Sequence, residues 1–268
     1  KAEIKAGTYQ VLPQANLYNV LALLTHGKEH QFQLTFIEGS TFEQWLVQLK
    51  NQPELTHSLK GLTLAQITQH LGIKQANPEG WFFPETYAFT KGTDDLELLT
   101  RAHKTMQSKL AQLWQTRAVG LPYETPYQAL IMASIIEKET SYIPEQALIA
   151  SVFINRLAKK MRLQTDPTVI YAITKGVPKT DGKGPLGRRL LTKDLEYDSP
   201  YNTYKYPGLP PGPIANPGAA AIKASLNPEQ HDYIYFVADG SGGHAFAKTL
   251  AGHNANVAKW RKIRRSQQ

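Results

Sequence analysis

The chain has 268 residues, of which 41% are hydrophobic and 19% are charged, and it contains no cysteine. The absence of cysteine excludes disulfide bonds, thiolate metal sites and a cysteine nucleophile. The length suits one larger domain and a small one, and the net charge of +8 favours an acidic partner such as nucleic acid, anionic lipid or an anionic wall polymer. Because no run of about 18 apolar residues and no signal-peptide pattern occurs, we expect these residues not to span a membrane.

The first fifty residues contain a weak internal repeat, in which each unit has a short strand, a turn and an amphipathic helix. Tyr9 and Val11 alternate with polar residues in the first unit, and Leu34 and Phe36 do so in the second. Each strand is followed by apolar residues at helical spacing. If the two strands pair and both helices pack on one face, residues 1–52 form a small α+β module that contains no catalytic cluster.

The segment EGWFFPETYAF, over residues 79–89, is dense in aromatic side chains. Such a segment forms either a platform on which sugars stack or a tightly packed corner. It is followed by an amphipathic helix over residues 94–118. We interpret this helix as scaffold.

The chain is organised around YQALIMASIIEKET, residues 127–140, an apolar helical run that ends in two glutamates. Met132, Ile135 and Glu139 recur at spacings of three and four and therefore share one face. A carboxyl that continues a buried apolar face is costly to ionise, so its pKa is expected to be raised. Glu139 is therefore the candidate general acid. The alternative is that EKET is only the solvated end of a buried helix.

Glu137 lies about 200° around the helix from Glu139 and extends a different row of side chains. The two carboxyls are therefore not expected to share a site. Glu139 is the first choice for the acid, and Glu137 is kept as a residue of the substrate site.

A second polar group follows in the segment RLQTDPTVIYAIT. Asp166 precedes Pro167 in the order expected for the N-cap and the first residue of a helix. Gln164, Thr165 and Asp166 would then lie at a helix N-terminus, where free backbone N–H groups can bind a ligand oxygen. The alternative is that Asp166 is only a cap.

The segment SPYNTYKYPGLPPGPIANPG is rich in Pro, Gly and Tyr and is predicted to be an ordered loop. Its Tyr201, Asn202 and Tyr204 offer hydroxyl and amide groups beside aromatic faces, a composition that suits carbohydrate. The elements expected after it are a short helix (219–226), a strand (233–237), a returning segment (244–248) and a basic terminal helix. Residues 53–268 are thus predicted to form a mainly helical domain with a peripheral antiparallel sheet, and the fold class is α+β.

Several common catalytic and binding motifs are absent from the sequence. No G-x-S-x-G elbow, P-loop or G-x-G-x-x-G motif occurs, and the histidines lack the spacing of a zinc site. No metal and no cofactor is therefore predicted. The positive charge is not accompanied by a nucleic-acid-reading motif, so no nucleic-acid partner is predicted either.

The motifs EGWFFPETY, ASIIEKET, SVFINRL, MRLQTDPTVIY, YNTYKYPGLPPGPIANPG and YFVADGSGGHAF resemble, in this order, the MltG-type (YceG-like) endolytic murein transglycosylases. The resemblance covers essentially the whole chain. It implies a LysM-like module at residues 1–52 and a catalytic domain at residues 53–268. It also implies an N-terminal inner-membrane helix, absent from this sequence, that holds the catalytic portion in the periplasm. Peptidoglycan strands are the implied substrate, and peptidoglycan synthases are candidate partners.

The reaction implied by this resemblance is cleavage of the MurNAc-β-1,4-GlcNAc bond within glycan strands, which leaves a 1,6-anhydro end. Transglycosylases place their acid in a helix-terminal Glu-Ser, followed by Gly-Leu-Met-Gln and Ala-Tyr-Asn segments. Glu139-Thr140, residues 162–164 and residues 200–202 stand in the same order here, with threonine in place of the serine. The match selects Glu139 as the acid. Gln164, Tyr201 and Asn202 are expected to orient the N-acetyl and hydroxyl groups.

One carboxyl can serve both steps of such a reaction, by donating its proton to the glycosidic oxygen and then accepting that of the muramic C6 hydroxyl. Two alternatives are left open by the sequence. The first is a hydrolytic muramidase in which Asp166 or Glu137 is a second carboxylate and water enters the product. The second is a peptidoglycan-binding scaffold in which the glutamates are structural and no bond is cut.

Overall fold

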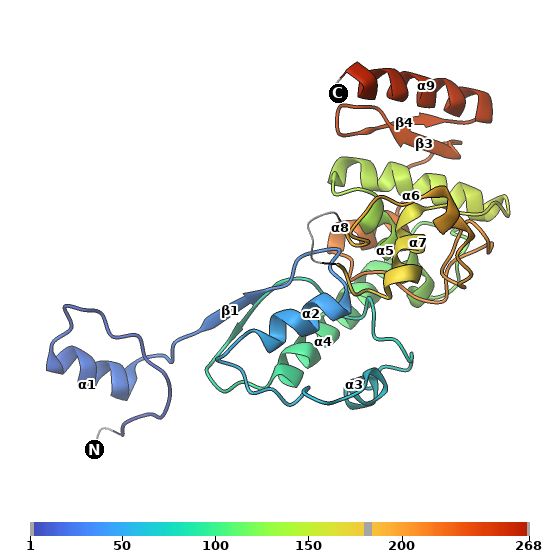
Figure 1. The fold of residues 1–268 in the computed structure, drawn as a ribbon. Coiled ribbons are helices and arrows are strands. Elements are labelled where there is room, and N and C mark those ends of the chain that lie inside the picture. Colours follow the sequence, from blue (N-terminus) through green and yellow to red (C-terminus); the bar gives the residue numbers. More distant parts are fainter. Residues whose placement is uncertain (1–2, 180–183, 267–268) are drawn as a thin grey trace.

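The computed structural model describes residues 3–179 and 184–266, and in these ranges it combines helices with two small antiparallel sheets (Figure 1). This arrangement confirms the α+β fold class. The elements in chain order are α1 (Leu17–His26), β1 (Phe32–Thr35), α2 (Phe42–Lys50), α3 (Leu64–Leu71), β2 (Thr86–Phe89), α4 (Asp95–Gln115), α5 (Pro126–Glu139), α6 (Ile143–Ala158), α7 (Asp166–Thr174), the 3-10 helix η1 (Thr192–Glu196), α8 (Ala219–Leu226), β3 (Tyr235–Ala238), β4 (His244–Ala247) and α9 (Leu250–Ser266).

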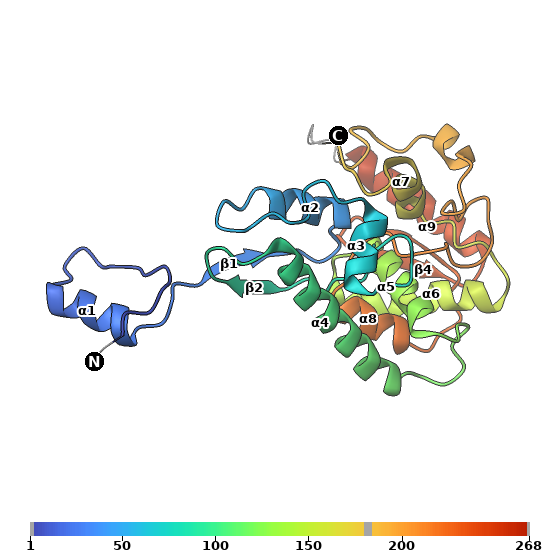
Figure 2. The ribbon, with the colours of Figure 1, turned by 90° about the horizontal axis from the view of Figure 1, so that it is seen from below.

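The segment that contains α1 stands apart from the rest of the chain in both ribbon views (Figures 1 and 2). Backbone hydrogen bonds from Lys5 to Leu24 and from His30 to Thr8 fold this segment back on itself. Its helix exposes large apolar side chains, since Leu17 is 81% exposed. Helix α1 therefore does not pack on α2 in the way that the internal repeat suggested.

The strand pairing predicted within the first fifty residues is wrong. β1 pairs with β2, which comes from the aromatic segment, and Leu34 lies opposite Tyr87. Both of these side chains are buried, whereas Val11 of the first unit is 51% exposed and its segment forms no strand. Pairing with β2 places the buried Leu34 of β1 opposite the aromatic ring of Tyr87, and such cross-strand contacts stabilise a sheet.

A first hydrophobic cluster joins β1 and α2 to the aromatic segment and to the first half of α4. Trp45 is fully buried and stacks on Phe36, while Phe42 stacks on Phe82. The aromatic segment is thus mainly a packed corner. Because this cluster includes side chains from Leu34 to Ala102, it spans residue 52; a LysM-like module bounded there is not confirmed, and the boundary stays a prediction.

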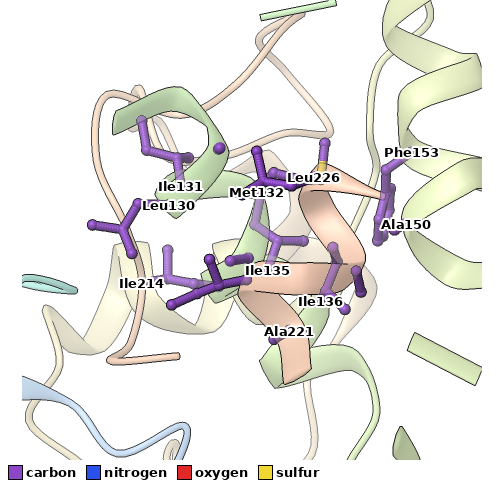
Figure 3. Close-up of a cluster of buried hydrophobic side chains, with 14 of the residues drawn as sticks. Leu130, Ile131, Met132, Ile135, Ile136, Ala150, Phe153, Ile214, Ala221 and Leu226 are labelled. Carbon is purple, nitrogen blue, oxygen red and sulfur yellow. The ribbon is translucent and has the colours of Figure 1, made fainter. Parts of the chain in front are cut away.

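The second cluster surrounds α5, as the apolar pattern of this helix predicts. Every residue of α5 from Ala129 to Ile136 is buried, and Thr125 caps the helix ahead of Pro126. Figure 3 shows α5 packed against α8, with Ala150 and Phe153 of α6 beside it. A helix that is apolar on all sides is stable only when it is enclosed in this way. Its polar side chains can then reach solvent or a ligand only at the end of the helix.

The hairpin of β3 and β4 lies at the edge of the molecule and carries α9 (Figure 1). This confirms the predicted peripheral antiparallel sheet. None of the residues of α9 is buried, so its basic side chains face solvent. No helix among residues 3–179 and 184–266 is long and apolar enough to cross a membrane.

Candidate active site

Glu139 is the last residue of α5, at the point where the chain leaves the buried core. Its side chain is partly exposed, and its Oε1 accepts a hydrogen bond from the hydroxyl of Thr165. Thr140 follows in an extended conformation, and its hydroxyl accepts from the backbone N–H of Tyr142. The helix end is thereby fixed, and it presents one carboxyl at the surface.

Burial raises the pKa of Glu139 to about 7. The hydrogen bond from Thr165 opposes this rise in pKa, the negative charge of Asp166 adds to it, and the charges of His244 and Arg156 oppose it. Near neutral pH the carboxyl is therefore present in both protonation states. A group of this kind can both donate and accept a proton.

Residues 162–166 lead into α7 beside Glu139, with buried and exposed side chains in alternation. Leu163 and Thr165 are buried, whereas Gln164, whose φ of 53° is in the left-handed region, and Asp166 are exposed. The segment is held by Thr203, whose carbonyl accepts from the Gln164 N–H and whose hydroxyl accepts from the Thr165 N–H. The Thr165 hydroxyl donates to the Glu139 carboxyl, and Gln164 is exposed on the outer side.

Asp166 is the first residue of α7, and Thr165 is the N-cap. The predicted cap position of Asp166 is therefore wrong by one residue. Its carboxylate accepts a hydrogen bond of 2.6 Å from the hydroxyl of Tyr204, whose backbone oxygen accepts from Arg162 at 3.0 Å. Arg162, Gln164 and Tyr204 border an open cavity of about 390 Å³. The predicted residues Thr165, Asp166 and Tyr204 are thus brought together beside Glu139, with Gln164 next to them.

Asn202 is fully buried, and its side chain is used inside its own loop. Its amide nitrogen donates to the backbone oxygens of Leu195 and Tyr197, and its amide oxygen accepts from the N–H of Tyr204. No amide hydrogen is left for a ligand. Asn202 therefore shapes the loop that carries Tyr204, instead of contacting a sugar itself.

Tyr201 lies away from this group of residues. Its ring lies against that of Tyr171, with 5.1 Å between the ring centroids, in a different cavity from that of Gln164 and Tyr204. Although it adjoins Asn202 in sequence, the turn at this position directs the two side chains differently. The structure therefore does not bring Tyr201 to Glu139.

Glu137 occupies a separate environment, as its position on the helix predicts. Its Oε2 accepts from the backbone N–H of Gly218, the N-cap of α8, at 3.0 Å. Burial raises its pKa, and this hydrogen bond opposes the rise. The neighbouring Lys138 donates to the carbonyl of Gly39 at 3.0 Å. These two side chains join α5 to the segment before α2 and to α8, so their role here is structural.

Two residues near Glu139, Arg156 and His244, were missed from the sequence. The buried guanidinium of Arg156 donates to the backbone oxygens of Ile234 and Leu163, each at 2.7 Å. His244 pairs with Glu145 through a contact of 2.8 Å between Nδ1 and Oε2. A signal for Arg156 was available, because it continues the buried stripe of Val152 and Phe153 as a charged residue on a largely apolar helix face. No comparable local signal marks His244.

Among residues 3–179 and 184–266 there is no group of three or more acidic or histidine side chains arranged to hold a metal ion.

Known proteins are similar to this chain over most of its length. Residues 1–259 match the model of the YceG-like family. A Bacillus subtilis protein named endolytic murein transglycosylase is 34% identical over 96% of this chain and 73% of its own length. A Streptococcus pneumoniae protein of the same name is 30% identical over 85% of this chain and 41% of its own length. The crystal structure of a YceG-like protein from Listeria monocytogenes superposes with a TM-score of 0.66 at 35% identity, over 94% of this chain and 85% of that one.

Proposed function

The chain belongs to the YceG-like family, and from that premise we propose that it is an endolytic murein transglycosylase, a lyase that cuts the MurNAc-β-1,4-GlcNAc bond within glycan strands. The observation that carries the proposal is the environment of Glu139. Its carboxyl lies at the end of a buried helix, is partly exposed and has a pKa of about 7. These properties suit one group that must act first as an acid and then as a base.

In the first step, protonated Glu139 donates its proton to the glycosidic oxygen. The bond between muramic C1 and this oxygen breaks, its electron pair stays with the departing GlcNAc, and C1 acquires oxocarbenium character. Glu139 is then a carboxylate. The hydroxyl of Thr165 and the charges of Arg156 and His244 favour this ionised form, because each of them lowers the pKa of Glu139.

In the second step, the C6 hydroxyl of the same muramic residue attacks C1 and gives its proton to Glu139. A 1,6-anhydro ring forms, no water is consumed, and the acid is restored. Since the attacking oxygen belongs to the same sugar, its effective concentration at C1 is high. The paired Asp166 and Tyr204 have hydroxyl and carboxylate groups with which to hold the sugar, as does the free amide of Gln164.

Hydrolysis is a second candidate reaction, because Asp166 lies close enough to Glu139 to raise its pKa and could activate a water. Mass spectrometry of purified glycan strands incubated with the wild-type protein and with Glu139→Gln separates the two. Products that lack one water at the muramic end, and that are absent with the variant, support the transglycosylase. Reducing ends would indicate hydrolysis, and binding without cleavage by the wild-type protein would indicate a scaffold.

We also keep as proposals the LysM-like character of residues 1–52 and an attachment to the inner membrane that places the active site on the wall side, with peptidoglycan synthases as partners. Murein is the polymer in the names of the two relatives, which supports an extracytoplasmic site of action. Co-purification of the full-length protein with membranes, followed by protease accessibility in spheroplasts, tests the location.

A further inference from the structure

A second cavity, of about 500 Å³, lies beside the middle of α7 and is separate from the one at Gln164. Its walls come from the starts of α2 and α3, the segment before the aromatic corner, α7 and the loop after η1. Its main lining residues are Phe42, Asn77, Glu79, Tyr171, Tyr197 and Tyr201. This volume is within the range of small-ligand sites, which combine apolar walls with a few polar groups.

The walls of this cavity are largely aromatic. The ring of Tyr171 lies against that of Tyr201, and Phe42 is buried behind them. Tyr197 is 41% exposed, so one wall is open to solvent. Tyrosine combines an apolar ring with a polar hydroxyl, a combination that suits the alternating apolar and hydroxyl surfaces of a sugar.

The floor of the cavity is formed by Glu79, which is only 2% exposed. Its carboxyl accepts from the Phe42 N–H at 2.9 Å and is bonded to the Tyr171 hydroxyl at 3.2 Å. The amide nitrogen of Asn77 also donates to the Tyr171 hydroxyl, at 2.9 Å. Burial raises the pKa of Glu79 to about 8, so the carboxyl carries a proton at neutral pH.

When Glu79 is ionised, the Tyr171 hydroxyl donates to its Oε2 and accepts from Asn77. When Glu79 carries its proton, Oε2 can donate to the Tyr171 oxygen instead, and the direction of this hydrogen bond reverses. Because Tyr171 lines the cavity, its hydroxyl proton can then be directed to a ligand there. A ligand that carries a neutral acceptor, such as a carbonyl or hydroxyl oxygen, would satisfy it.

The charges around the cavity nearly balance. Glu43 and Lys175 have opposite charges, and Asp198 is already paired with Lys205 at 3.2 Å. Tyr206 also donates to Asp198, at 2.7 Å. A strongly charged ligand is therefore not favoured, whereas an uncharged one is.

We propose that this cavity is a second carbohydrate subsite, which binds an uncharged N-acetylhexosamine unit with its acetamido carbonyl towards Tyr171 and its ring or methyl group against Tyr197 and Tyr201. This proposal rests on the proposed function in one respect, namely that the bound sugar unit belongs to a murein strand. Helix α7 and the loop after η1 contribute to both sites, since Asp166 and Tyr204 lie at the catalytic centre. Tyr171 is five residues beyond Asp166 on α7, roughly 8 Å along the helix axis.

Calorimetry with the uncharged tetramer of N-acetylglucosamine tests the subsite, in the Glu139→Gln background so that no turnover occurs. We expect binding of this tetramer, but not of cellotetraose, which lacks acetamido groups. Tyr197→Ala and Tyr171→Phe should each weaken binding about tenfold, the loss expected for one aromatic or hydrogen-bonded contact. Tyr18→Ala is the control, because Tyr18 is an exposed tyrosine of α1 and does not line the cavity.

Gln164→Ala serves to locate the bound tetramer, since Gln164 borders the cavity of Arg162 and Tyr204 and not this one. Loss of binding with Gln164→Ala alone would place the tetramer in that other cavity and overturn the proposal. The absence of tetramer binding, an equal loss with Tyr18→Ala, or tighter binding of the deacetylated, cationic tetramer would also overturn it. The unfolding midpoint of each variant shows whether it is folded. Tetramer binding by a protein that does not cleave murein would contradict the proposed function and leave the subsite standing.

Discussion

Glu139 and Glu79 both have pKa values raised by burial, and yet they differ in exposure and in hydrogen bonding. Burial raises the pKa of Glu139 to about 7 and that of Glu79 to about 8. Glu139 is partly exposed, and its Oε1 accepts a hydrogen bond from the hydroxyl of Thr165. Glu79 is closed off from solvent, and it joins the first residue of α2 to Tyr171 on α7 and to Asn216.

This difference shows that a raised pKa alone indicates only that a carboxyl is buried. Whether the carboxyl can transfer a proton depends on whether a substrate can reach it. Glu79 has the higher pKa, but its two oxygens are bonded to protein groups from three segments of the chain. Glu139 ends its helix at the surface, so a glycosidic oxygen can reach it. We therefore assign the proton transfer to Glu139, and to Glu79 the joining of the segments that form the second cavity.

The largest effect is expected from exchanging the carboxyl at each position for an amide of the same shape. Glu139→Gln should lower the rate of murein cleavage by about 10²- to 10⁴-fold, the usual contribution of a general acid. Glu79→Gln should change this rate by less than about tenfold, since an amide can keep most of the hydrogen bonds. Release of soluble glycan measures both, with Glu137→Gln as a further control. A Glu79→Gln variant as inactive as Glu139→Gln would contradict the comparison.

The second prediction concerns stability, for which the replacement of Glu79 should have a larger effect than the replacement of Glu139. Glu79→Ala should lower the free energy of unfolding by about 2–4 kcal/mol, because it leaves the Phe42 N–H and the Tyr171 hydroxyl without their partner in the interior. Glu139→Ala should cost less than about 1 kcal/mol, since a partly exposed carboxyl with one hydrogen bond is lost. Urea unfolding at pH 6 measures both.

The pH dependence of stability sharpens the same prediction. The pKa of Glu79 is raised from 4.5 to about 8, so the folded state binds this proton more tightly than the unfolded state does. The protonated Glu79 therefore contributes fully to the free energy of unfolding below about pH 4.5, and this contribution is lost as the pH rises through about 8. Glu79→Gln should therefore remove much of the loss of stability of the wild-type protein between pH 5 and 9. An unchanged pH dependence in this variant would show that Glu79 is ionised in the folded protein.

The third prediction is a shift in the pH profile of cleavage. Because Glu139 must carry a proton and its pKa is about 7, kcat/KM should fall as the pH rises above 7. Asp166→Asn removes a negative charge that raises this pKa, so the fall should begin at lower pH. His244→Gln removes a side chain whose protonated form lowers this pKa, so the fall should move to higher pH. Shifts in the same direction for both variants would contradict this account of the electrostatics.

The sequence predicted the site best where a local pattern determines the structure. The apolar run of α5 predicts a buried helix with Glu139 at its end, and the positions of Glu137 and Glu139 on the helix predict that they separate. The polar residues at the N-terminus of α7 were likewise expected to form part of the site. In each case the backbone of one short segment fixes where the side chain points.

The prediction failed where the partner of a segment is distant in the chain. β1 could pair with any suitable strand, and only the burial of Leu34 against Tyr87 selects β2. The amide of Asn202 is a group that suits sugar binding, but it forms hydrogen bonds with the backbone of its own loop. Arg156 and His244 reach Glu139 through tertiary contacts that no short spacing encodes. The site residues that were missed are those held by such long-range packing.

The smallest effect is expected for Tyr204→Phe, which tests whether Asp166 needs its hydrogen bond. The hydroxyl of Tyr204 is 2.6 Å from the Asp166 carboxylate, and its loss should lower kcat by about three- to tenfold, as expected for one hydrogen bond to a charged group. Tyr206→Phe is the matched control, because it removes a similar bond of 2.7 Å to Asp198, a carboxylate that is not among the charges that shift the pKa of Glu139. An equal fall in kcat for both variants would show that the bonds only stiffen their loop. A fall confined to Tyr204→Phe, and abolished when Asp166→Asn is already present, would show that Tyr204 acts through Asp166, because groups that act as one unit lose their effect together.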